Sequence, residues 1–318
     1  MKRIAIIIPS QGEDYLKSTV LDGLSQLSRE GHVEFRVSSI LKKDEFADYA
    51  CVADLILIIW WGKKKFDLEL VERINRWERT VFIDGSEVGS NNGMTHRYDF
   101  DIQYGILSGT DHGPGAPNQV MLKQCALYFR REKPYGSGIM PLPYGIEERY
   151  TKYYDANKEK DIDFACMFGQ DEYPRMRRHA KKLLTKWCDA NGFTYRVEPT
   201  KTADEFYQLL ARAKVGVSIG GGGYDTARFW EILANNCLVL CERIDIFQPD
   251  SGAFDYERIW EFNNLYDFQY QLEKIGEFLR TGYTTVDLTT EYNAILETHG
   301  AKARVLTILY EARKKGII

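Results

Sequence analysis

One segment of the chain combines a run of glycines with charged residues at helical spacing. From Val215 to Glu242 it reads VGVSIGGGGYDTARFWEILANNCLVLCE. The apolar residues at its start predict a buried strand, and the four glycines predict positive φ angles or close approach of the backbone to another group. A helix is expected from Asp225 or Thr226, because both residue types are good N-caps. The unpaired N–H groups at such a helix start suit a phosphate.

The expected helix places polar side chains on one stripe. Arg228, Glu231 and Asn235 stand at positions i, i+3 and i+7. The simplest interpretation of Arg228 and Glu231 is an exposed ion pair worth about a few tenths of a kcal/mol, and the alternative is a polar ligand site. Neither a Walker-type lysine and serine nor GxGxxG spacing accompanies the glycines, so neither a P-loop nor a conventional dinucleotide site is indicated.

A catalytic base is sought where other predicted strands end, because ligands of open parallel sheets bind beyond the carboxyl ends of the strands. Asp84 and Glu87 follow a predicted strand, and His112 lies in a loop rich in glycine and proline. Histidine titrates near neutral pH, which suits a base. The simpler interpretations are a turn cap for Asp84 and solvent exposure for His112. Asp14 and His96 are further candidates, and the sequence does not choose among the five.

The alternation of strand and helix patterns predicts an α/β protein with two similar halves. Apolar runs such as Ile4–Ile8 are typical of strands buried on both faces, and amphipathic helices follow them. After a polar stretch at 150–160, interpreted as a linker, the pattern restarts. We therefore expect two Rossmann-like domains facing across a cleft, over residues 1–149 and 161–290, and a C-terminal helix over 291–318 that packs back onto the first domain.

Composition bounds the class of protein. With 318 residues, 44% hydrophobic and 28% charged, the chain suits a soluble globular protein of two domains. Its net charge of −4 argues against a dominant nucleic-acid-binding surface, which usually makes a domain basic. The six cysteines form no CxxC pair, so we expect no metal site and a reducing, cytoplasmic location. The longest apolar stretch, Leu55–Trp61, is too short to span a bilayer.

The segment DTARFWEILANNCLVLCE resembles the donor-binding segment of glycosyltransferases with the two-Rossmann (GT-B) architecture. It is most similar to the group-1 type related to the spore-maturation protein CgeB, and the exostosin segment is similar. Those families have a helix of the form R-F-x-E-x-L-A-x-G-x before an apolar strand. Five residues match this pattern: Arg228, Phe229, Glu231, Leu233 and Ala234. Asn236 stands at the glycine position, where a left-handed C-cap tolerates either residue. The closing segment ETHGAKARVLTIL is also similar, with His299 interpreted as structural.

The resemblance also implies roles for residues. Glu231 would hydrogen-bond the ribose hydroxyls of a sugar nucleotide, Gly169 would make room for the donor, and Arg175 would neutralise its diphosphate unless it is simply solvated. The implied donor site is completed by Gly221, Gly222, Gly223, Asp225 and Arg228. Many retaining members have a second glutamate where this chain has Gly223. Its role would pass to Asp225 or to backbone amides, and the stereochemical outcome stays open.

The function that the resemblance implies is metal-independent hexosyl or pentosyl transfer, with a nucleotide-sugar as co-substrate and no further cofactor. The first domain would bind the acceptor, which could be a saccharide, a small molecule, a protein or a modified nucleic-acid base. A sugar-nucleotide epimerase and a non-catalytic nucleotide- or sugar-binding protein are the alternatives, and Gly223 favours the second. Basic clusters at 63–65 and 175–182 predict salt-sensitive binding if DNA is the acceptor.

Overall fold

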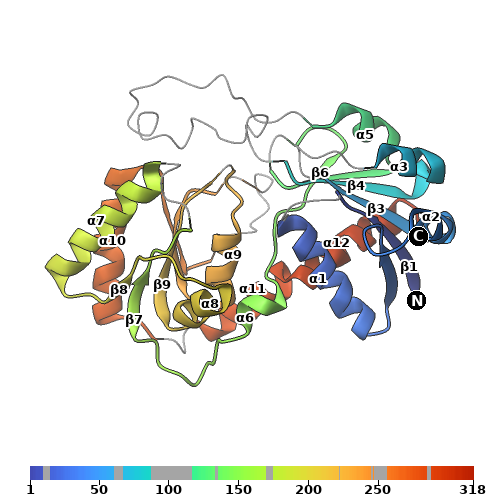
Figure 1. Cartoon of the computed structure of the whole chain (residues 1–318). Helices are drawn as coiled ribbons and strands as arrows, with labels where there is room; N and C mark the ends of the chain where they lie inside the picture. Colours follow the sequence, from blue (N-terminus) through green and yellow to red (C-terminus); the bar gives the residue numbers. More distant parts are fainter. Residues whose placement is uncertain are drawn as a thin grey trace.

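The computed structural model contains two parallel sheets, each with helices packed on both faces (Figure 1). This confirms the predicted α/β class. The residues that the structure describes are 1–9, 15–60, 67–86, 117–132, 135–169, 175–221, 223–244, 246, 256–284 and 288–318. Among them, every helix is too short or too polar to traverse a lipid bilayer.

The first sheet has six parallel strands in the order β2-β1-β3-β4-β5-β6. Alternate residues of a strand face opposite sides, so Ile4 and Ile6 of β1 face α1, whereas Ala5 and Ile7 face α2 and α3. The elements of this half are β1 Lys2–Ile7, α1 Tyr15–Arg29, β2 Val33–Val37, α2 Lys43–Val52, β3 Leu55–Trp60, α3 Leu68–Ile74, the 3₁₀ turn η1 Trp77–Arg79, β4 Thr80–Asp84, α5 Gln119–Gln124, β5 Leu127–Arg130 and β6 Ile139–Pro141.

The second sheet has five parallel strands in the order β11-β10-β9-β7-β8. Val215 and Val217 of β9 belong to the cluster that packs against α7 and α10, whereas Val239 and Cys241 of β10 pack with α8 and α9. The elements are β7 Ile162–Ala165, α7 Arg175–Asn191, β8 Tyr195–Arg196, α8 Ala203–Ala211, β9 Ala213–Ser218, α9 Ala227–Ala234, β10 Leu238–Glu242, β11 Ile259–Phe262 and α10 Leu265–Thr281.

The two halves are joined at two places. The short helix α6 (Glu148–Thr151) leads from the first sheet toward the second, and α11 (Thr289–His299) and α12 (Ala301–Lys314) lead back. As predicted, the C-terminal helices pack back, and α12 lies against α1 (Figure 1). A parallel bridge pairs Ile146 with Gly300 between these two crossings.

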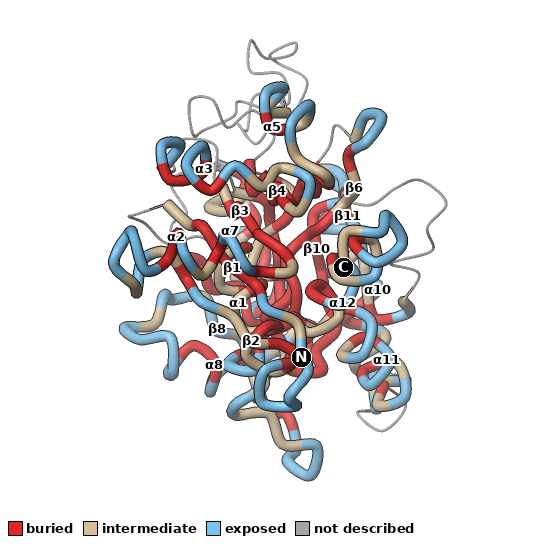
Figure 2. The backbone as a smooth tube through the Cα atoms, turned by 90° about the vertical axis from the view of Figure 1, so that its right-hand side faces the viewer, coloured by how far each residue is buried: buried red, intermediate tan, exposed pale blue. Residues whose placement is uncertain are grey.

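One apolar cluster runs through both halves, from α1 and the first sheet to α8, α9 and α12. Figure 2 shows the buried backbone gathered in the strands. The polar stretch interpreted as a linker is anchored at its end, because the buried Nζ of Lys160 donates to the carbonyl oxygens of Ala213 (2.8 Å) and Asn235 (2.7 Å). The two domains therefore meet over a packed interface.

Candidate functional site

The glycine-rich turn after β9 is held by groups from other elements. The N–H of Gly220 donates to Oε2 of Glu242, at the end of β10 (3.0 Å). A Cβ placed on Gly223 would lie 2.5 Å from Oε2 and 2.6 Å from Cδ of Glu132, a residue of the first domain. Close approach of the Glu132 carboxylate therefore favours glycine at position 223.

Helix α9 begins after Thr226, whose hydroxyl lies 3.1 Å from that of Ser218. In the first two turns of the helix, Arg228 Nη1 and Glu231 Oε2 form an ion pair at 3.5 Å, with side chains only 21% and 10% exposed. The pair is therefore mostly buried, unlike the exposed pair of the simplest interpretation. Asn235, expected on the same polar stripe, is fully buried and donates to the carbonyl oxygen of Tyr150 (3.0 Å).

The Arg228 guanidinium has N–H groups that make no hydrogen bond to a described residue. It lies over the ring of Phe206, 3.8 Å from the centroid, and its Nε and Nη1 are buried without a hydrogen bond to any residue that the structure describes. Glu231 Oε1 accepts a hydrogen bond from the hydroxyl of Tyr207 (3.2 Å). Leaving buried N–H groups unsatisfied is costly, so this side chain is suited to bind an acceptor-rich ligand.

These side chains line a pocket of about 460 Å³ between the two domains. That volume lies in the range of small-molecule sites, about 300–1,000 Å³. Four of the lining residues are cations, and Glu231 is the only carboxylate among those that the structure describes. The first domain contributes Tyr15, Lys17, Ser18 and Arg149, and the second contributes Thr200, Lys201, Thr202, Ala203, Phe206, Tyr207, Arg228 and Glu231. The pocket suits an anionic ligand with polar groups.

The predicted capping box forms the edge of this pocket. The Thr202 hydroxyl accepts from the N–H of Glu205 (3.1 Å), and the Glu205 carboxylate accepts from the N–H of Lys201 (3.0 Å). In a standard capping box this carboxylate would accept from the N–H of Thr202, and here it accepts from the residue before it. This cap fixes the start of α8, and with it the side of the pocket that follows β8.

Asp225 lies at the contact between the domains instead of lining the pocket. Its two carboxylate oxygens accept from the N–H of Tyr144 (2.8 Å) and from Nε1 of Trp230 (2.7 Å), and its own N–H donates to Glu132 Oε1 (2.9 Å). Burial raises the pKa of Asp225 to about 6, and the nearby Arg131 partly offsets that rise. This carboxylate therefore fixes the end of the turn against the first domain.

Asp84 is fully buried at the end of β4. Its Oδ2 accepts from the hydroxyl of Tyr128 (2.6 Å) and from Arg130 Nη1 (3.2 Å), and its Oδ1 accepts from the N–H of Ser86 (2.9 Å). The last bond is the turn cap of the simpler interpretation. A carboxylate with no exposed surface does not reach an acceptor in this conformation, so its role as a base stays a prediction.

The remaining predicted residues are only partly described. Gly169 is exposed, and a Cβ there would meet no atom of the described residues within 4 Å. Arg175 is the first residue of α7, and its side chain lies outside the description. Also outside the described residues are Glu87, His112, Gly222, Asp14 and His96. Arg228 and Glu231 are thus the predicted residues that the structure brings together in one pocket.

Sequence reasoning missed the other cations of the pocket and also Glu132, the carboxylate of the first domain that contacts the turn. Lys17, Arg149 and Lys201 belong to segments far apart in sequence, and nothing in their spacing links them. Glu132 had a weak signal, because three charged residues in a row, RRE, follow the apolar strand LYF. Charges that directly continue a buried strand are candidates for buried, paired groups.

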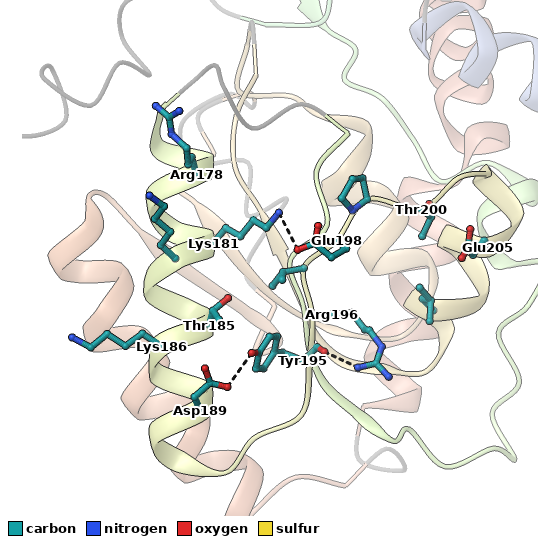
Figure 3. A pocket seen from close by; sticks show the side chains of 14 residues that line it. Arg178, Lys181, Thr185, Lys186, Asp189, Tyr195, Arg196, Glu198, Thr200 and Glu205 are labelled. Carbon is teal, nitrogen blue, oxygen red and sulfur yellow. Dashed lines mark hydrogen bonds and ion pairs between the residues drawn. The ribbon is translucent and has the colours of Figure 1, made fainter.

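A second concavity, of about 960 Å³, lies between α7 and the segment after β8 (Figure 3). Its charges are mixed. Lys181 faces Glu198 (3.7 Å), and the hydroxyl of Tyr195 donates to Asp189 (2.9 Å). Thr200 lines both concavities, so the groove adjoins the interdomain pocket. No group of His, Cys, Asp and Glu that could hold a metal ion occurs in the described part of the chain.

Comparison with known proteins identifies a fold. No protein-family model and no curated protein matches the sequence. A solved alpha-glucosyltransferase, in complex with UDP and a 13-mer DNA containing a central A:G mismatch, is similar in structure with a TM-score of 0.58 at 9% identity, over 98% of this chain and 99% of that one. A glycosyltransferase from Rickettsia africae gives 0.59 at 10% identity, over 99% and 98%.

The HepE protein of Anabaena, in complex with UDP, gives a TM-score of 0.55 at 9% identity, over 99% of this chain and all of that one. All three likenesses extend over nearly the whole of both chains, so the order of elements and the arrangement of the two sheets are shared. At such identity the likeness is one of fold. The chain has the two-domain GT-B architecture that the sequence predicts.

Proposed function

We propose that this chain is a glycosyltransferase that moves a sugar from a nucleotide-sugar donor to an acceptor without a metal ion. The observation behind the proposal is the interdomain pocket, in which Arg228 and Glu231 meet the segment that follows β8. Open parallel sheets bind ligands beyond the carboxyl ends of their strands. The structural likeness to glycosyltransferases supports the proposal, and the finer resemblance to the CgeB-like, group-1 type belongs to it.

The pocket suits the nucleotide half of a donor. Glu231 would accept hydrogen bonds from ribose hydroxyls, and Arg228 would direct its spare N–H groups at phosphate oxygens. Three further cations would add to the neutralisation of the diphosphate: Lys17, Arg149 and Lys201. The proposed donor segment also includes Gly169, Arg175, Gly221, Gly222, Gly223 and Asp225, the last acting through the turn that it holds.

The transfer breaks the bond between the anomeric carbon of the sugar and a diphosphate oxygen, and it forms a bond from that carbon to an acceptor oxygen. The nucleoside diphosphate leaves with the bonding electron pair, so negative charge grows beside the pocket cations. The acceptor hydroxyl gives its proton to a base. For that step we retain Glu87 and His112, or the leaving phosphate itself. Asp84 would serve only after Tyr128 and Arg130 release it.

One observation favours a non-catalytic binding protein as the second candidate. Two of the carboxylates that the sequence offers for chemistry, Asp84 and Asp225, are at most 3% exposed and engaged in hydrogen bonds. A protein with an intact nucleotide pocket and no reachable base would bind a nucleotide-sugar without transferring it.

The first experiment is a thermal-shift titration with UDP, GDP, ADP, TDP and CMP, each with magnesium and with EDTA. A ligand at 100 times its Kd stabilises the folded state by about 2.7 kcal/mol. We expect one nucleotide to raise the melting temperature equally under both conditions. If none does, the proposal is wrong.

The matching nucleotide-sugar then separates the candidates. A transferase releases free nucleotide when an acceptor is present. A sugar-nucleotide epimerase changes the sugar without releasing the nucleotide, and a binding protein does neither. The acceptors to offer are those of the sequence prediction: saccharides, small molecules, proteins and DNA with a modified base.

Glu231 is tested with the nucleotide that binds best and its 2′-deoxy form. If its carboxylate contacts the ribose hydroxyls, the wild type prefers the ribonucleotide by about tenfold, the value of one hydrogen bond to a charged group. Glu231→Gln should lose most of that preference. Tyr207→Phe is the matched control, because it removes the hydroxyl that donates to Glu231 and leaves the carboxylate. An unchanged preference in Glu231→Gln would rule out the ribose role.

A further inference from the structure

Hydrogen bonds run without a break from the carboxyl edge of the first sheet to the glycine turn of the second. Arg130 Nη1 donates to Asp84 Oδ2 (3.2 Å), and Arg130 Nε donates to the carbonyl oxygen of Glu132 (2.7 Å). The Glu132 carboxylate then accepts from the N–H of Asp225 (2.9 Å). These four residues are at most 3% exposed. A buried, fully bonded chain of this kind holds its members in one geometry.

The same carboxylate also shapes the turn sterically. Oε1, Oε2 and Cδ of Glu132 occupy the space that a side chain at position 223 would need. One residue of the other domain therefore fixes the positions of two residues here. Glu132 is in close contact with Gly223 and accepts a hydrogen bond from the N–H of Asp225. The turn leads directly into α9, with Arg228 in the first turn of the helix and Glu231 at the start of the second.

We propose that Glu132 is a positioning residue, which sets the donor-binding turn and the start of α9 from the opposite domain. The proposal rests on the function proposed above and extends it. Glu132 lines neither of the two concavities described, and in the second domain it contacts Gly223 and Asp225, so the role proposed for it is exerted through the turn. Donor affinity would then depend on a residue of the acceptor domain.

The alternative is that Glu132 only stabilises the interface. The two views differ in one measurable quantity. A stabilising contact changes the melting temperature and leaves the nucleotide affinity of the folded protein alone, whereas a positioning contact changes that affinity in protein that is still folded.

The test is a double-variant cycle on the full chain, with UDP affinity from calorimetry as the readout, or that of whichever nucleotide binds best. Gly223→Ala must displace either the turn or the buried Glu132 carboxylate that accepts from the Asp225 N–H. Either shift should weaken binding about tenfold or more, since misplacement of a site by about 1 Å has effects of this size. Glu132→Ala should weaken binding less. In the combined variant the Glu132 side chain is absent and the collision does not occur. Its nucleotide affinity should therefore be close to that of Glu132→Ala alone.

Glu132→Gln keeps the shape and the acceptor for the Asp225 N–H, and we expect an affinity within about threefold of the wild type. Two controls are matched in chemistry and distant from the turn. Gly276→Ala places a Cβ 2.5 Å from Cη2 of Trp187, and Asp163→Asn changes a carboxylate that pairs with Lys214 (2.8 Å). Both should lower the melting temperature and leave the affinity unchanged.

Two results would overturn the proposal. One is a Gly223→Ala effect of equal size with and without the Glu132 side chain. The other is a set of Glu132 variants that change only the melting temperature. If the wild type binds no nucleotide, the proposed function is wrong, and the positioning role is wrong with it. If the wild type binds a nucleotide but the variants behave as above, only the positioning role is wrong.

Discussion

Charged residues are used in opposite ways at the carboxyl edge of the first sheet and in the wall of the interdomain pocket. At the sheet edge, Asp84, Arg130 and Glu132 have no exposed surface and are bonded to one another or to neighbouring groups. In the pocket wall, Nε and Nη1 of Arg228 are buried without a hydrogen bond to a described residue, and Nη1 has only the longer ion-pair contact with Glu231 (3.5 Å). Both regions are built from ordinary arginines and carboxylates.

The difference lies in what completes the hydrogen bonds. At the sheet edge the protein itself completes them, so these charges fix the shape of the molecule. In the pocket wall the protein leaves them incomplete, so a ligand gains by completing them. Substitutions in the pocket wall should therefore act mainly on binding. Substitutions of Asp84 and Arg130 should act mainly on stability, whereas Glu132 should also affect binding, because it contacts the donor-binding turn.

The largest effect is expected for Asp84→Ala. It leaves the Arg130 guanidinium buried without its carboxylate, and breaking a buried pair in this way costs about 3–5 kcal/mol. Urea unfolding monitored by circular dichroism measures the loss. Glu231→Ala, in the pocket wall, should cost less than half as much. Equal losses would show that the two regions do not differ as described.

The second prediction concerns Asp225 and pH. Burial raises its pKa to about 6, from an ordinary value of 3.8. The folded protein therefore keeps this proton over a range in which the unfolded chain has lost it, so the stabilisation is fully present below about pH 4 and is lost as the pH rises through about 6. The difference in unfolding free energy between the wild type and Asp225→Asn should fall by on the order of 3 kcal/mol over that range. A difference that grows with pH would contradict the buried, proton-holding carboxylate.

The third prediction sharpens the binding side of the comparison. Arg228→Ala should weaken binding of the best nucleotide by about 10- to 100-fold, because hydrogen bonds to charged groups contribute about 1.5–3 kcal/mol. Arg228→Lys keeps the charge and loses the planar fork, so it should restore only part of the affinity. Calorimetry on folded protein measures both. Full affinity in Arg228→Ala would exclude this guanidinium from the ligand site.

The smallest effect is expected on the outer face of α7. Arg178, Lys182 and Lys186 line the groove of Figure 3, and surface substitutions of this kind change stability by about 0.5 kcal/mol or less each. Replacing all three with Gln should leave nucleotide affinity unchanged. If duplex DNA binds here, the slope of log affinity against log salt should become shallower by up to about three. An unchanged slope would place any DNA contact elsewhere.

Local features of the fold were predictable because they depend on neighbouring residues. The Thr202–Glu205 cap is present, and Asn236, placed by the sequence at a left-handed helix end, has φ 50°. The stripe of Arg228 and Glu231 follows from helical spacing alone.

Contacts between the domains could not be predicted in this way. Glu132 and Gly223 are far apart in sequence and meet only because one domain covers the other. The same covering buries Asp225, and α6 covers Asn235 through the carbonyl oxygen of Tyr150. Both positions in the sequence resemble those of exposed polar residues. The sequence shows which residues follow the carboxyl ends of the strands. It does not show which of these residues the second domain will bury.

The return of α12 to the first domain has a consequence for synthesis. The apolar face of α1, with Leu16, Val20 and Leu24, belongs to the same cluster as Val305 and Ile308 of α12. A ribosome delivers the chain from its N-terminus, so the early half emerges while its cover is still untranslated. That half can complete its core only after α12 has left the exit tunnel, and a chain truncated before residue 301 would leave the apolar face of α1 exposed.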